Sequence, residues 1–129
     1  LPGRGPLGGI HTALRHIEDD VLIVPCDAPF LTAEDVDRLV REWDTESIVV
    51  YIHDGRIYPI PGIYTVYLLP EIEKRLEGAG RDLSLQDFIR EEPNVKYVEI
   101  DDEDLNHLIG INTPEDYKRA TGRDIEDIS

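Results

Sequence analysis

A run of four apolar residues, Val21-Leu22-Ile23-Val24, most constrains what this chain can fold into. β-Branched side chains dominate the run, which is typical of a strand buried on both faces of a parallel sheet. The run follows residues 7–17, where apolar side chains recur at helical spacing, and a second helix is expected to begin at Thr32. A buried strand between two helices predicts an α/β fold with a largely parallel sheet.

Further helices and strands are expected to alternate along the rest of the chain. Thr32 is placed to cap the second helix, whose inner face would carry Leu39, Val40 and Trp43. Residues 57–64 contain two prolines and are therefore expected to form an irregular or edge segment. The other expected elements are strands at 47–52, 95–100 and 108–111, helices at 67–76 and 84–90, and a last helix beginning at Thr113.

The length and composition of the chain indicate one domain and limit its partners. A chain of 129 residues can close one hydrophobic core, so residues 1–129 are expected to form a single domain. The net charge of −15 argues against nucleic-acid binding, because no basic stripe is present to neutralise phosphates. No apolar stretch approaches the roughly 20 residues of a membrane span, so no membrane association is expected. Acidic runs such as residues 101–104 are expected to be solvated turns.

The first residue and the single cysteine lead to two further expectations. The sequence has no methionine, and Leu1 would not normally follow a removed initiator, so upstream strands are expected to be missing. Cys26 has no internal disulfide partner and is predicted to be a buried thiol, which fits a reducing, cytoplasmic compartment.

Asp27 is the first candidate for chemistry because it comes directly after the apolar run. Ligands of open α/β sheets bind beyond the carboxyl ends of the strands. Pro25 and Pro29 stiffen the backbone on either side of Asp27. A carboxylate held at a strand end suits Mg²⁺, which takes one or two protein carboxylates and completes its shell with water and phosphate oxygens. The alternative is that Asp27 only accepts hydrogen bonds within its own turn.

A glycine-rich segment, Gly5-Pro6-Leu7-Gly8-Gly9, opens the first helix and is the second candidate. Glycine lets the backbone approach a ligand closely, and a helix N-terminus offers free N–H groups to phosphates or nucleotides. Gly8 and Gly9 lie in the first turns, where each glycine costs about 1 kcal/mol relative to alanine. That cost suggests that side chains there would obstruct something. The alternative is a plain tight turn.

Asn112 is the third candidate, because it follows the last predicted strand. Its amide oxygen would help to hold a cation or a substrate phosphate, or would only close a turn. The histidines give weaker signals. His53 and His107 fall in predicted turns, and no two histidines have the spacing of a transition-metal site.

Four segments of the sequence together resemble the molybdenum cofactor guanylyltransferases. They are GPLGGIHTALRH, VLIVPCDAPFLTAEDVDRLV, YPIPGIYTVYLLPEIEKRLEGAGRDLSLQDFI and GINTPEDY, in this order and spacing. The resemblance implies a Rossmann-like three-layer nucleotidyltransferase fold with a mostly parallel sheet, here lacking its N-terminal strands. Residues 1–129 would then be the C-terminal portion of that domain. It also implies that GMP is transferred from Mg-GTP to the phosphate of molybdopterin cofactor, with release of pyrophosphate.

The same resemblance assigns roles to the candidate residues. The glycine-rich segment would line the guanosine pocket. Asp27 would be the catalytic residue that contacts the nucleotide and binds Mg²⁺, with Asn112 as a second ligand. GTP and molybdopterin cofactor would be the substrates, and contact with proteins that deliver the cofactor is a further expectation. The Gly-rich triphosphate loop of the family and its lysine are not in this sequence, so the chain alone is expected to be inactive.

Other functions remain open at this point. The nearest alternative is a sibling nucleotidyltransferase that uses CTP with the same pterin, or that acts on a corrinoid precursor. A receiver-like acidic α/β module would need further acids beside Asp27 and a lysine at the end of a later strand, whereas Lys74 and Lys118 fall in predicted helices. An interaction fragment without chemistry is the third alternative, which nucleotide binding would exclude.

Overall fold

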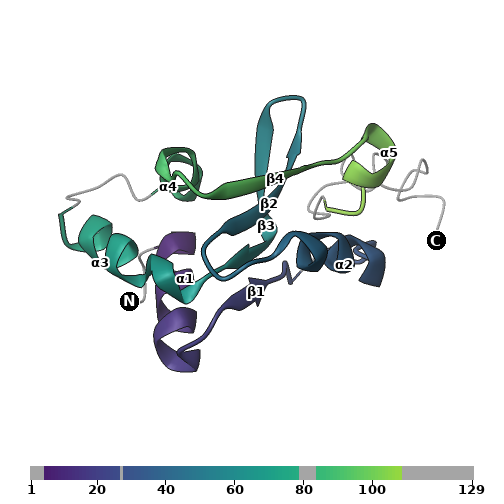
Figure 1. Cartoon of the computed structure of the whole chain (residues 1–129). Helices are drawn as coiled ribbons and strands as arrows, with labels where there is room; N and C mark the ends of the chain where they lie inside the picture. The colour runs from purple at the N-terminus through teal and green to yellow at the C-terminus, as the bar shows by residue number, and fades with distance from the viewer. Residues whose placement is uncertain (1–4, 27, 79–83, 109–129) are drawn as a thin grey trace, which may run out of the picture.

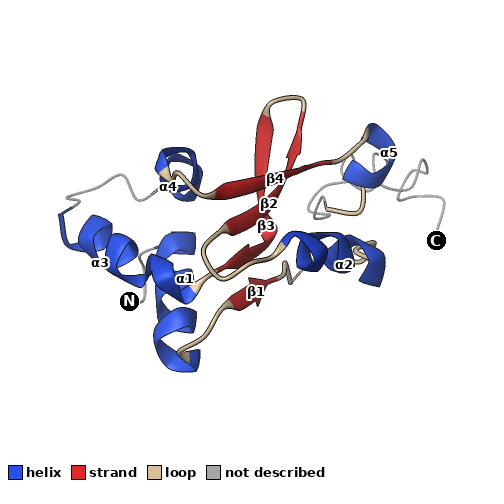
Figure 2. Cartoon of the chain, viewed as in Figure 1, coloured by secondary structure: helices blue, strands red, loops and turns tan. Residues whose placement is uncertain are grey.

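The computed structural model describes residues 5–26, 28–78 and 84–108. Their four strands form one mixed sheet in the order β1-β3-β2-β4 (Figure 2). Strands β1, β2 and β4 run in one direction and β3 runs in the opposite direction. Two of the three strand pairings are antiparallel, so the described sheet is mixed and not mostly parallel as predicted. The strands are β1 (Val21–Ile23), β2 (Ile48–His53), β3 (Arg56–Tyr64) and β4 (Val95–Glu99).

Helices cover both faces of the sheet, which makes three layers (Figure 1). One face is covered by α1 (Gly5–Ile17), α3 (Leu69–Gly78), α4 (Leu85–Glu91) and the short 3₁₀ turn η1 (Val66–Leu68). The other face is covered by α2 (Ala33–Glu42) and α5 (Asp102–Leu105). Successive residues of β2 point into the two cores in turn, as the pleat of a strand requires. The predicted three-layer α/β fold is confirmed.

Local signals in the sequence place the starts of two helices correctly. The Thr32 side chain accepts from the Asp35 backbone N–H, and the Asp35 carboxylate accepts from the Thr32 N–H, which completes a capping box at α2. Ser84 caps α4 with its hydroxyl oxygen, which accepts from the Asp87 backbone N–H at 3.3 Å. The predicted inner face of α2 is correct only for Leu39, because two further residues point to solvent: Val40 is 45% and Trp43 is 44% exposed.

The prediction for residues 57–64 is wrong, because they form most of β3, which lies between β1 and β2. The β2–β3 register jumps from Val50↔Gly62 to Tyr51↔Tyr58, so residues 59–61 bulge out of the ladder. β1 pairs only with residues 62–64. Both prolines therefore lie where neither neighbour needs a backbone N–H, which is how a central strand tolerates them.

The expectation that the apolar run at 21–24 is buried on both faces is also wrong for the described residues. β1 pairs with β3 alone in the described sheet, and Leu22 is 38% exposed. The chain also leaves β conformation after Ile23, so that Val24 lies beyond the strand. None of the described helices is long and apolar enough to cross a bilayer. The predicted strand at 108–111 and the helix at Thr113 lie outside the described residues, apart from Leu108.

Helix α5 was not expected, because its residues read as a solvated acidic turn. Asp101 caps the helix, and its carboxylate accepts from the Asp104 N–H at 2.8 Å. The acidic residues of the first turn lie at the positive end of the helix dipole. The acidic run therefore stabilises a four-residue helix instead of forming only a turn.

Candidate functional site

The carboxyl ends of β1, β2 and β4 lie at one edge of the sheet, because these three strands are parallel. The segment leading to Asp27 leaves this edge after β1, His53 ends β2, and α5 follows β4 (Figure 1). Ligands of α/β sheets bind at such an edge. The candidate site is therefore sought among the residues that follow these strands and the helices that flank them.

The sequence-predicted site residues fall partly outside the described part of the chain. Asp27 and Asn112 lie outside it, so their side chains are not placed. Gly5 begins α1, and residues 6–9 follow it in the first turns of the helix. Leu7 is fully buried in the core, so only its backbone is available to a ligand. Among residues 6–9, Pro6 and Gly9 are exposed.

Packing in the described structure does not require a glycine at position 9. A Cβ built at Gly9 meets no atom within 4 Å. Gly9 lies in the first half of α1, where glycine is unfavourable relative to alanine. Neither packing nor helix propensity explains why glycine stands at this position. The explanation that the sequence suggested, that a side chain here would obstruct a ligand, stays a prediction.

Cys26 is exposed, so the prediction of a buried thiol is wrong. The apolar run ends as a strand at Ile23, and the following residues leave the sheet before Cys26 is reached. The residue before Asp27 is thus open to solvent at the carboxyl edge of the sheet.

A cluster of polar side chains joins α2 to α5 at the same edge, and Asp35 is at its centre. Only 3% of Asp35 is exposed. Its carboxylate accepts from the Thr32 N–H at 2.9 Å and lies 3.0 and 3.2 Å from Nδ1 of His107. The Tyr51 hydroxyl donates to the backbone carbonyl of Asp35, and burial raises the pKa of Tyr51 to about 12, which keeps this donor protonated. The buried carboxylate is therefore fully paired.

His53 makes a second contact between β2 and the α5 region. Its Nδ1 lies 2.8 Å from the carbonyl oxygen of Ile100, and its Nε2 lies 2.9 Å from Oδ1 of Asp102. Both partners are acceptors, so both ring nitrogens must carry protons to donate to them. The Ile100 carbonyl and, after it, the Asp102 carboxylate raise the pKa of His53 above its ordinary value of 6.5. The geometry thus favours the imidazolium form.

The folded protein should lose stability as His53 deprotonates. A raised folded pKa means that the contribution of His53 is fully present below pH 6.5 and disappears as the pH rises through the folded value. We expect the free energy of unfolding of the wild type to fall more between about pH 6 and pH 9 than that of His53→Gln, which does not titrate there. Urea denaturation at a series of pH values measures this. Parallel pH profiles for the two proteins would contradict the assigned protonation.

Arg38 completes the contacts between α2 and the α5 region. Its guanidinium donates to the Glu99 carbonyl at 2.8 Å and lies 3.5 Å from Oδ2 of Asp104. It also lies over the ring of Tyr51, 5.4 Å from the ring centroid. Among the described residues, no group of three or more His, Cys, Asp or Glu side chains is arranged to hold a metal ion. The cluster links α2, β2, β4 and the α5 region at this edge of the sheet.

Sequence reasoning missed this cluster for a physical reason. A Thr32-x-x-Asp35 pattern could have predicted the capping box from local spacing. The contact between Asp35 and His107 joins residues 72 positions apart, and no local signal in a single sequence announces it.

Comparison with known proteins agrees with this architecture. The sequence profile of the MobA-like NTP transferase domain matches residues 1–96. The chain belongs to the MobA-like NTP transferase family. The predicted resemblance is thereby confirmed at the level of the family. The carboxyl edge described above is part of the nucleotidyltransferase fold of this family. The two solved structures described below share this fold.

Two relatives in this MobA-like family carry functional names. The probable molybdenum cofactor guanylyltransferase of Carboxydothermus hydrogenoformans is 36% identical over 92% of this chain and 62% of its own length. The molybdenum cofactor guanylyltransferase of Vibrio parahaemolyticus is 35% identical over 87% of this chain and 56% of its own length. The chain thus spans about three-fifths of the relatives that it matches.

Two solved structures share the fold. Molybdopterin-guanine dinucleotide biosynthesis protein A from Archaeoglobus fulgidus superposes with a TM-score of 0.68 at 27% identity, over 92% of this chain and 62% of that protein. A putative protein from Aquifex aeolicus superposes with a TM-score of 0.71 at 25% identity, over 84% of this chain and 56% of that protein. The nucleotidyltransferase fold implied by the sequence is confirmed.

Proposed function

We propose that the protein is a molybdenum cofactor guanylyltransferase, which transfers GMP from Mg-GTP to the phosphate of molybdopterin cofactor and releases pyrophosphate. The observation that carries the proposal is family membership together with the names of relatives at 35–36% identity. Residues 1–129 would form part of one nucleotidyltransferase domain, acting in the cytoplasm and receiving its pterin substrate from delivery proteins.

The residues assigned to the site are those that the sequence suggested. Residues 5–9 at the start of α1 would line the guanosine pocket with backbone atoms, which accords with the buried side chain of Leu7 and the open space at Gly9. Asp27 would bind Mg²⁺ and contact the nucleotide, and Asn112 would be a second ligand. One or two protein ligands suffice for Mg²⁺, so the absence of a larger metal cluster among the described residues fits this ion.

The chemistry needs little from the protein beyond position and charge. Bound Mg²⁺ would neutralise charge that develops on the phosphate oxygens. Transfer would proceed by in-line attack of the terminal phosphate oxygen of molybdopterin on the α-phosphorus of GTP, with pyrophosphate as the leaving group and no covalent enzyme intermediate. The rigid sheet edge would hold the two substrates in line, which is where most of the rate enhancement of such a reaction arises.

The proposal is tested with the full-length gene product, Mg²⁺ and molybdopterin cofactor. Release of pyrophosphate and formation of the guanine dinucleotide are expected with GTP. Turnover with CTP and not with GTP would replace the proposal by the cytidylyl-transferring alternative. Turnover with neither nucleotide would reject the transferase assignment.

Gly9→Ala should separate the folding role of this position from its binding role. The variant is expected to gain about 1 kcal/mol in the free energy of unfolding, because alanine is the better helix former and the added methyl group meets open space. It is expected to bind GTP at least about tenfold more weakly, because the methyl group would lie between the backbone and the nucleoside. Chemical denaturation and calorimetric titration with Mg-GTP measure the two effects. Unchanged GTP affinity would remove this segment from the proposed pocket.

A further inference from the structure

The hydrogen bonds of Asp35 connect two distant parts of the chain. One carboxylate oxygen accepts from the Thr32 backbone N–H at 2.9 Å, at the start of α2. The same carboxylate lies 3.0 and 3.2 Å from Nδ1 of His107, just after α5. A carboxylate accepts only, so Nδ1 carries the proton and donates. Asp35 therefore holds the beginning of one helix and the end of another with a single buried side chain.

The residues held by Asp35 flank the two ligands assigned to Mg²⁺. Thr32 follows Asp27 by five residues, and His107 precedes Asn112 by five residues. Asp35 and His107 lie at the carboxyl edge of the sheet, where the chain leaves β1 and β4.

We propose that Asp35 and His107 are a positioning pair for the proposed transfer reaction. Together they set the place of the chain that follows Asp27 relative to the chain that leads to Asn112. The kinetic consequence of this inference rests on the proposed function. Its structural consequence rests on the hydrogen bonds of the described residues. A displacement of about 1 Å in a reacting group costs up to about 10²-fold in rate, so a link of this kind acts on turnover without touching substrate.

The capping box alone does not account for the burial of Asp35. A capping acid at the third helical position normally stays near solvent, whereas only 3% of Asp35 is exposed and His107 covers it. Loss of the His107 donor would leave a buried carboxylate with fewer partners. Glu34 and Arg38 on α2 and Asp104 on α5 are charged groups that act on Tyr51, whose neutral hydroxyl donates to the backbone carbonyl of Asp35.

Three variants of His107 distinguish a loss of the positioning role from a general loss of stability. His107→Asn keeps an N–H donor at nearly the place of Nδ1. His107→Leu keeps the bulk and removes the donor. His107→Gln keeps a polar side chain but carries its amide past Nδ1, and it replaces the leucine variant should that variant not fold. His53→Gln is the matched control, because it removes the ring N–H that donates to the Ile100 carbonyl and the charge beside Asp102, whose side chain is 95% exposed.

The structural half of the proposal is tested by amide hydrogen exchange on the chain itself. His107→Leu is expected to raise exchange about tenfold or more in peptides covering residues 28–32 and 102–108, with no change in the β2 core. His107→Asn is expected to restore slow exchange, and His53→Gln to leave the 28–32 peptide unaffected. Unchanged exchange in both peptides, or a uniform rise over the whole chain, would overturn the proposal.

The kinetic half is tested on the full-length gene product. His107→Leu is expected to lower kcat about 10- to 100-fold and to raise the Mg²⁺ concentration needed for half-maximal rate, with KM for GTP changed less than about threefold. His107→Asn should recover most of kcat. Equal kcat for the leucine variant and the wild type would overturn the positioning role even if GTP is the substrate. Absence of turnover in the wild type would instead reject the proposed function and leave the exchange result to decide the link.

Discussion

Asp27→Asn in the full-length gene product is expected to lower kcat for GMP transfer by about 10³-fold. An asparagine amide is neutral and binds Mg²⁺ far more weakly than a carboxylate. The metal is expected to contribute about 4 kcal/mol to stabilising charge in the transition state, and each 1.36 kcal/mol corresponds to a factor of ten. Pyrophosphate release measured over a range of Mg²⁺ concentrations should show that excess metal restores only part of the rate.

Asp37→Asn is the matched control for this substitution. Asp37 is an exposed acid on α2 that attracts Arg41 electrostatically. The control should keep full turnover and the wild-type dependence on Mg²⁺. Both variants should unfold at nearly the wild-type temperature. Wild-type turnover by Asp27→Asn would withdraw the metal role from this residue.

Gly62→Ala is expected to destabilise the protein by about 3 kcal/mol and to lower Tm by about 10 °C. Gly62 is buried in β3 and pairs with Ile23 of β1 and Val50 of β2, so the strand has no freedom to move aside. A Cβ at this position would overlap the backbone carbonyl of Pro59. The same carbonyl accepts the hydrogen bond of the Tyr64 hydroxyl at 2.7 Å, and displacing it would leave a buried hydroxyl unpaired.

The two glycine substitutions have opposite expected signs, which makes each a control for the other. Gly9→Ala adds the same methyl group where no atom lies within 4 Å and should stabilise the chain. Chemical denaturation of both variants under one set of conditions measures the contrast. A Gly62→Ala variant as stable as the wild type would show that the bulge at 59–61 relaxes without cost.

Helices α1, α2 and α4 could be predicted because their signals are local. Thr32 and Ser84 cap α2 and α4 within three residues of the N–H groups that they accept from. The apolar spacing of α1 places Leu7, Ile10 and Leu14 on one buried face. Such signals depend on neighbours in sequence, so a single chain contains the information needed to find them.

The sheet was harder to predict because its order depends on distant residues. Two prolines argue against a central strand, and only the bulge opposite Val50 and Tyr51 shows how β3 accommodates them. The apolar run at β1 correctly indicated a strand but not its neighbours, since burial on a face depends on which strands lie beside it. Helix α5 has four residues, which is too short for a periodic signal.

The candidate site was predicted in part. The sequence indicated the carboxyl edge of the sheet and the glycine-rich start of α1, because both depend on the order of elements and on residue type. It gave no indication of the pairing of Asp35 with His107, or of the two acceptors around His53. These contacts join side chains and backbone from β2, α2 and the α5 region, so they are properties of the fold and not of any one segment.

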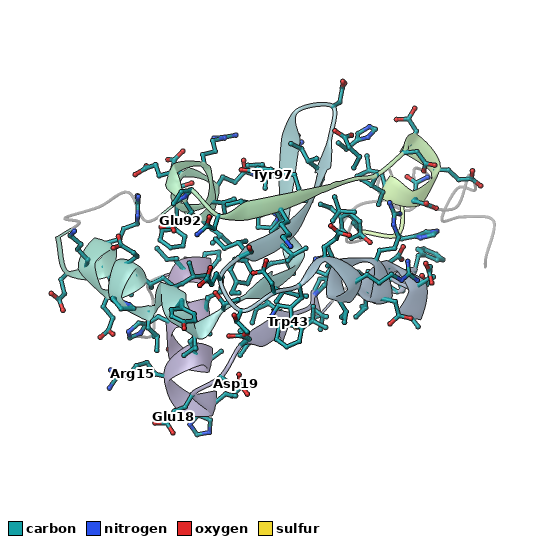
Figure 3. All side chains as sticks on the ribbon, viewed as in Figure 1. Arg15, Glu18, Asp19, Trp43, Glu92 and Tyr97 are labelled. Carbon is teal, nitrogen blue, oxygen red and sulfur yellow. The ribbon has the colours of Figure 1, made fainter. Side chains whose placement is uncertain are left out.

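The chain has a single tryptophan, and its surroundings make it a defined optical probe. Trp43 follows α2, and its indole N–H donates to Oδ2 of Asp20 at 3.0 Å, across to the turn before β1 (Figure 3). An indole that is 44% exposed already emits close to the wavelength of a solvated one, so unfolding should shift its emission maximum only slightly. Fluorescence anisotropy should change much more, since the ring is released from its carboxylate partner. Denaturation followed in this way will report how the end of α2 separates from the turn at residues 18–20.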